Sequence, residues 1–146
     1  MKSRMDINKA EPGIYQAMSA ADKLVRGFDI DPKLKELIKV RVSQINGCGY
    51  CINYHTKDAL ALGETSQRLF ALSAWWETPF FTEEEQAALR LAEEVTNISR
   101  GVGDETYERV LKLFGEQKVA QLIFIAITIN SWNRIAIPVH MVAEQD

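Results

Sequence analysis

The sequence lacks the features that define several large classes of protein. Its longest apolar run, Leu122–Ile127, is far shorter than the ~18 residues that a membrane-spanning helix needs. The net charge is −3, and no cluster of lysine and arginine offers a footprint for nucleic acid or for anionic lipid. No apolar signal-peptide core follows the first residues. We therefore expect a cytoplasmic protein that binds neither nucleic acid nor a membrane.

Cysteine and histidine are scarce, with two residues of each in 146. Both cysteines, Cys48 and Cys51, form a C-x-x-C pair, and His55 follows Cys51 by one helical turn. In the cytoplasm such a pair is seldom a structural disulfide and is more often catalytic, redox-sensing or metal-binding. The other histidine, His140, lies near the C-terminus and receives no role here.

The length of 146 residues suits one domain over residues 1–146, large enough to bury its own core. Helix start and stop signals recur along it, above all the Asp31-Pro32 start and the capping box at Thr82–Glu85. We expect helices from Pro12 to about Gly27, from Asp31 to Gly47, from Cys48 to Gly63, after Thr65, from Thr82 to about Ser99, and from a cap at Asp104 through Phe114.

The segment Glu116 to Arg134 is rich in β-branched residues and could form a buried strand. It has no second strand-like run to pair with, and neither glycine nor proline interrupts it before Pro138, so we predict a helix. A helix that is apolar on all sides is buried on all sides, either at the centre of the domain or against another subunit. The expected architecture is all-α, with roughly six to eight helices and an oligomeric assembly.

The cysteine pair lies where local geometry favours redox chemistry. Cys51 and His55 share one helix face, and Cys48 at the start of the helix can close a disulfide with Cys51. Glu36 lies on the preceding helix, and a turn at Gly47 could fold it back toward the pair. Lowering a thiol pKa by about two units increases the thiolate about 25-fold but lowers its nucleophilicity about eightfold. A positioned proton donor contributes on the order of 10² to 10⁴, so we assign His55 and Glu36 to proton transfer first.

Other interpretations of the same residues remain open at this point. The cysteines could be two small buried hydrophobic residues, or the two cysteines, His55 and Glu36 could bind zinc, although a second C-x-x-C or an H-x-x-x-H is missing. Taken alone, Glu36 is best interpreted as a solvated helix residue among neighbouring lysines. Tyr50 and Tyr54 are expected to line a pocket. The three tryptophans are expected to be packing or interface residues: Trp75, Trp76 and Trp132.

The pattern E-x(11)-C-x-x-C-x(3)-H, formed by Glu36, Cys48, Cys51 and His55, resembles the core motif of the alkylhydroperoxidase D-like (AhpD-like) group within the carboxymuconolactone decarboxylase family. The surrounding K-V-R-V-S-Q-I-N-G-C-G-Y-C-I-N-Y-H-T-K-D-A, the later L-S-A-W-W-E-T-P-F-F-T and the closing I-N-S-W-N-R-I-A also resemble its small single-domain members. The likeness covers most of the chain.

The resemblance implies an all-helical fold that assembles as trimers or hexamers and has peroxidase and disulfide reductase activity. It implies that Cys51 attacks the peroxide, that Cys48 resolves the sulfenic acid to a disulfide, and that Glu36 and His55 relay protons. The best-studied members carry a second relay histidine where this chain has Tyr50. Tyrosine does not replace it as a base at neutral pH, so their peroxidase efficiency does not carry over. The decarboxylases of the wider family lack the cysteine pair.

We therefore expect a thiol-dependent peroxidase that reduces hydrogen peroxide or organic hydroperoxides with no metal, flavin or haem. Each turnover would leave a Cys48–Cys51 disulfide, so a protein reductant is required, either thioredoxin-like or a dihydrolipoyl domain. The alternative is a redox-sensing module or a protein disulfide reductase that uses the same cysteine pair.

Overall fold

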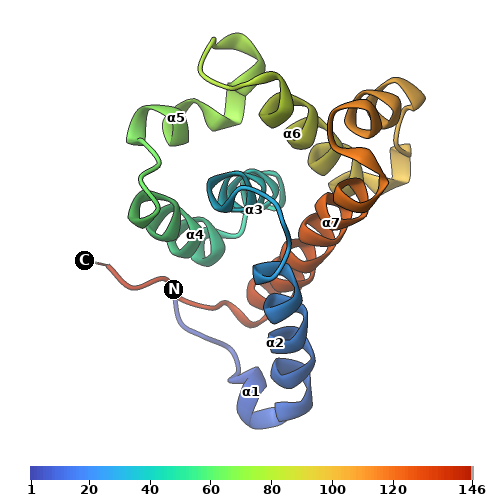
Figure 1. Ribbon diagram of the computed structural model, residues 1–146. Helices are drawn as coiled ribbons and strands as arrows, with labels where there is room; N and C mark the ends of the chain where they lie inside the picture. Colours follow the sequence, from blue (N-terminus) through green and yellow to red (C-terminus); the bar gives the residue numbers. More distant parts are fainter. Residues whose placement is uncertain (146) are drawn as a thin grey trace.

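The computed structural model describes residues 1–145, and these are helical with no strand (Figure 1). The all-α prediction is confirmed. The elements in chain order are α1 (Ile7–Ala10), α2 (Pro12–Arg26), α3 (Pro32–Asn46), α4 (Gly49–Ala61), α5 (Ser66–Ala71), the 3₁₀ helix η1 (Leu72–Glu77), α6 (Glu83–Thr96), the 3₁₀ helix η2 (Ile98–Arg100) and α7 (Asp104–Val139).

Helix α3 lies at the centre of the molecule, with α4, α5, α6 and α7 arranged around it (Figure 1). Leu37 and Val40 pack toward α5, η1 and part of α6, whereas Ile38 and Val42 pack toward α6 and α7. All four side chains are fully inaccessible to solvent. Burying an aliphatic side chain of this size stabilises the fold by about 1.5–3 kcal/mol, so α3 is held firmly from both sides.

Helix α7 confirms the prediction of a helix over Glu116 to Arg134. It is interrupted at Gly115, whose φ of 76° and ψ of 164° are not helical, and then continues past Pro138 to Val139. Its length and apolar composition alone would permit a membrane span. It packs instead against α2, α3, α4 and α6, with Leu122, Ile125 and Ala126 in the core, which is the behaviour of a central helix in a globular domain.

Most helix ends lie where the capping signals placed them, and three details differ. The capping box of Thr82 and Glu85 is present, and Asp31 caps α3. Gly103, rather than Asp104, is the N-cap of α7, because Asp104 is already helical. Helix α6 ends at Thr96 and is followed by η2. The short α1, which Asp6 caps, was not predicted.

Candidate functional site

The connection between α3 and α4 is only two residues long and fixes the position of Cys48. Gly47 has a left-handed φ of 72°, which a glycine adopts without steric cost. The N–H of Gly47 donates to the carbonyl of Gln44 at 3.3 Å, and the N–H of Cys48 donates to that of Ser43 at 3.0 Å. Cys48 is at the same time the N-cap of α4, where its sulfur accepts the N–H of Cys51 at 3.3 Å. The pair therefore begins a helix, as predicted, with its backbone anchored to the central helix.

Cys48 and Cys51 are joined as a disulfide, with their Cα atoms 5.3 Å apart. Both residues are buried, at 2% and 4% exposure. They differ in what they face: Cys51 lines a cavity, whereas Cys48 is not among the residues of its wall. A molecule in that cavity would meet Cys51 first.

Glu36 and His55 are in direct contact across the α3–α4 pair. The Glu36 carboxylate lies 2.8 Å from Nδ1 of His55 through one oxygen and 2.6 Å from Nζ of Lys39 through the other. Glu36 is 6% exposed, so its interpretation as a solvated helix residue was wrong. Burial alone would raise the pKa of Glu36, but the hydrogen bond from His55 and the Lys39 charge outweigh it and lower that pKa. The carboxylate therefore stays ionised and holds the imidazole in one orientation.

The cavity beside these residues has a volume of about 420 Å³. Tyr50 and Tyr54 line it, as predicted. Trp132, expected to be a packing or interface residue, also lines it, and its indole N–H donates to Asp22 at 3.1 Å. The full wall consists of Tyr15, Asp22, Arg26, Glu36, Lys39, Tyr50, Cys51, Tyr54, His55, Asp58, Thr128, Ile129, Trp132, Ala136 and Met141.

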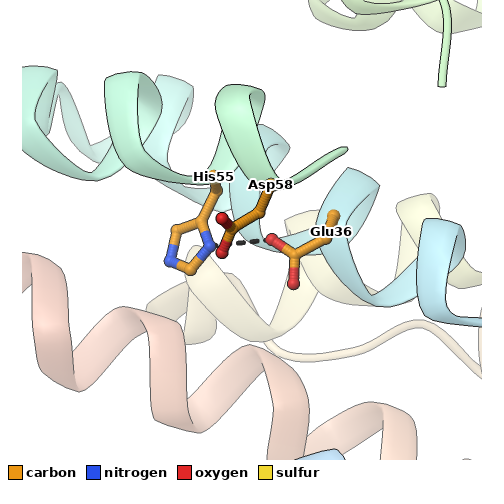
Figure 2. Close-up of side chains that lie close together, drawn as sticks. All are labelled: Glu36, His55 and Asp58. Carbon is orange, nitrogen blue, oxygen red and sulfur yellow. Dashed lines mark hydrogen bonds and ion pairs between the residues drawn. The ribbon is translucent and has the colours of Figure 1, made fainter. Parts of the chain in front are cut away.

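A second carboxylate belongs to the same group of side chains and was not singled out from the sequence. Glu36, His55 and Asp58 each offer a polar atom, and these atoms lie within 4.8 Å of one another (Figure 2). The sequence signal was present, because Asp58 is three residues after His55 and seven after Cys51, on the same helix face. These three residues could converge on a cation. However, the Lys39 ammonium bound to Glu36 opposes a second positive charge there.

A buried polar network behind the cysteines joins α3 to α7. Asn133 is fully buried; its amide donates to Ser43 at 3.0 Å, and its oxygen accepts from the amide of Asn46 at 2.8 Å. Asn46 also donates to Asn130 at 2.9 Å. Because buried amides and hydroxyls are costly without partners, this network fixes the end of α3 and therefore the turn that carries Cys48.

The four residues predicted for the site are thus found in one region. Glu36 touches His55, and His55 and Cys51 share the cavity wall. In this disulfide form no hydrogen bond among residues 1–145 joins His55 to either sulfur. A reactive sulfur, an oriented imidazole and a chamber for a small molecule are the components of thiol chemistry coupled to proton transfer.

Comparisons with known proteins point to one family. The model of the carboxymuconolactone decarboxylase family matches residues 12–94. The uncharacterized protein YdfG of Bacillus subtilis is 44% identical over 138 residues, which cover 94% of each chain. A crystal structure from Agrobacterium tumefaciens, of a protein of unknown function described as a candidate antioxidant defence protein AhpD, superposes with a TM-score of 0.96 at 31% identity over 99% of this chain and 100% of that one. The debrominase Bmp8 shares the fold, with a TM-score of 0.84 at 20% identity over 93% of this chain and 74% of its own.

Proposed function

Because the chain belongs to the carboxymuconolactone decarboxylase family and to its AhpD-like group, we propose that it is a dithiol peroxidase acting on hydrogen peroxide or organic hydroperoxides. The proposal rests on one observation: Cys51 and His55 line the same cavity, and the Glu36 carboxylate contacts Nδ1 of His55. Membership alone does not select this reaction, since the same fold also serves a debrominase.

The cycle begins when the disulfide is reduced to two thiols and the Cys51 thiol releases its proton to solvent through the cavity. The Cys51 thiolate attacks the terminal oxygen of the hydroperoxide, an S–O bond forms, and the O–O bond breaks. The departing alkoxide takes a proton from the His55 imidazolium and leaves as an alcohol, or as water when the substrate is hydrogen peroxide. The Cys48 thiol then attacks the Cys51 sulfenic acid, which yields the disulfide and one water molecule.

The composition of the cavity wall supports this division of roles. Cys51 lines the cavity and Cys48 does not, so a substrate in the cavity reaches Cys51. Cys48, as the N-cap, sits behind it, where it can form a disulfide with little backbone movement.

Return to the dithiol requires two electrons and two protons from another dithiol. A thioredoxin-like protein or a dihydrolipoyl domain has the chemistry for this exchange. A cytoplasmic location and a trimeric or hexameric assembly belong to the same proposal.

Cysteine variants test the assignment of roles. The reduced wild type should lose two thiols per chain on reaction with peroxide. Cys51→Ser should lose none at a comparable rate, whereas Cys48→Ser should lose one and form a sulfenic acid that dimedone traps. The reverse behaviour of the two variants would show that the roles are exchanged.

The alternative, a redox sensor or protein disulfide reductase, uses the same pair without peroxide turnover. Its signature is rapid thiol oxidation by a protein or small-molecule disulfide together with slow oxidation by every hydroperoxide. Comparing the two oxidants on the same reduced sample separates the two functions.

A further inference from the structure

We propose that Asp58 completes a proton relay between solvent and His55, returning through one bridging water the proton that the imidazolium gives up in each turnover. This inference rests on the proposed peroxidase function. It assigns to Asp58 a part that neither the cysteine motif nor the position of Glu36 indicates.

The geometry places Asp58 at the site. Its carboxylate oxygen lies within 4.8 Å of a ring nitrogen of His55 and of an oxygen of Glu36 (Figure 2). One water molecule that makes a hydrogen bond of about 2.8 Å to each side can span a separation up to this limit. Asp58 also lines the cavity, so it has access to solvent and to His55 at once.

Glu36 is poorly suited to this task. One of its oxygens contacts Nδ1 of His55 and the other contacts the Lys39 ammonium. These contacts lower the pKa of Glu36 despite its burial, so taking up a proton would break a charge-assisted pair. Glu36 is therefore a positioning residue that orients the imidazole, and another group must exchange protons with solvent.

The Asp58 carboxylate is available for that exchange. No side-chain hydrogen bond or ion pair among residues 1–145 engages it, in contrast to Glu36. Its charge acts inside the cavity, since it is the first cause, ahead of burial, of the raised pKa of Tyr54. Tyr50, which lines the same cavity, is not a base at neutral pH, so it does not carry protons to His55, whereas the Asp58 carboxylate can.

Other ionisable groups line the same cavity and contribute to the electrostatic potential at the Asp58 carboxylate. They are Tyr15, Asp22 and Arg26 of α2, Glu36 and Lys39 of α3, and Tyr50 and Tyr54 of α4. Of these, Asp22 accepts the indole N–H of Trp132, which ties it to the wall rather than to His55. This makes Asp22 a matched control with the same charge in the same cavity.

The test is steady-state reduction of peroxide with dithiothreitol in saturating excess as the reductant, followed across pH and across imidazole concentration at constant ionic strength. Imidazole should raise the wild-type rate far less than it raises the rate of Asp58→Asn. Asp58→Asn should be slower by roughly 10-fold in dilute buffer, because water replaces only part of a positioned proton carrier, and imidazole should restore the rate. Asp58→Glu should retain most of the rate, and Asp22→Asn should acquire no dependence on imidazole.

The possible outcomes distinguish a failure of the proposed relay from a failure of the proposed peroxidase function. If the wild type consumes peroxide but Asp58→Asn keeps its rate and pH profile, the relay is wrong and the peroxidase stands. If Asp58→Asn is slow and neither imidazole nor Asp58→Glu restores the rate, Asp58 has a structural role and the relay is also wrong. If the wild type does not consume peroxide, both proposals fail.

Discussion

Replacing Glu36 with glutamine should cost stability at neutral pH and cost much less in acid. The carboxylate makes two charge-assisted contacts, at 2.8 Å to His55 and at 2.6 Å to Lys39. A hydrogen bond to a charged group contributes about 1.5–3 kcal/mol. Glutamine has nearly the same shape but carries no charge, and its one oxygen can accept from one of the two partners. We expect Glu36→Gln to lower the free energy of unfolding by about 2–4 kcal/mol at pH 7, which is about 6–12 °C in Tm for a chain of this size.

The pH dependence follows from the lowered pKa of Glu36, whose ordinary value is 4.5. A carboxylate with a lower pKa in the folded state contributes its stability in full above the unfolded value. That contribution is lost as the pH falls through the folded value. Urea unfolding of the oxidised protein at pH 7 and near pH 3 should therefore show a smaller difference between wild type and Glu36→Gln at the lower pH.

A surface variant provides the control for this measurement. Glu108 is exposed on α7, and Glu108→Gln should change the free energy of unfolding by less than about 0.5 kcal/mol at either pH. An equal loss for Glu36→Gln at both pH values would refute the reasoning, because it would mean that the charge of Glu36 does not stabilise the fold.

Two further predictions concern the turn and the cavity. Gly47→Ala should lower the free energy of unfolding by about 1–2 kcal/mol in urea unfolding, because φ is 72°; the added Cβ meets no atom within 4 Å, so the loss comes from the backbone conformation alone. Gly27→Ala, at a φ of −80°, should be neutral or stabilising. Equal losses for the two variants would contradict this account of the turn. Tyr50→His places an imidazole in the cavity wall and should raise peroxide turnover at pH 7 by roughly 10-fold. An unchanged rate in a folded Tyr50→His variant would mean that proton supply does not limit turnover.

The helices could be predicted from the sequence because local signals decide where they begin and end. Pro12 and Pro32 occupy the first turns of α2 and α3, and Gly47 adopts the left-handed conformation that ends α3. In the segment from Leu72 to Glu77, tertiary packing rather than local sequence signals determines the backbone conformation. It forms a 3₁₀ helix with a non-helical Ala74, and the buried Trp75 donates to Glu93 of α6 at 2.9 Å.

The burial of Glu36 could not be predicted from its neighbours. Three lysines surround it in the sequence, which suggested a solvated surface. The chain instead buries the stem of Lys35, whose Nζ donates to the carbonyl of Arg26 at 3.2 Å, and pairs Lys39 with Glu36 itself. Long basic side chains can lie along apolar surface, so their presence does not establish that a helix face is exposed.

The full set of residues in the cavity wall could not be predicted from the sequence either, because it depends on how distant helices pack. Cys51, His55, Tyr50 and Tyr54 lie on one helix, so helical periodicity brings them together. Tyr15, Asp22 and Arg26 come from α2 and Trp132 comes from α7, and no spacing in the sequence relates these segments to α4. Their meeting is a consequence of how α2 packs on α7.

The most direct test of the proposed function is the rate at which hydroperoxide oxidises the reduced protein, measured by stopped flow alongside free cysteine at the same pH. The account predicts loss of two thiols per chain, much faster than free cysteine reacts, and a large decrease in the rate for His55→Gln. Oxidation no faster than that of free cysteine and unaffected by His55→Gln would contradict it.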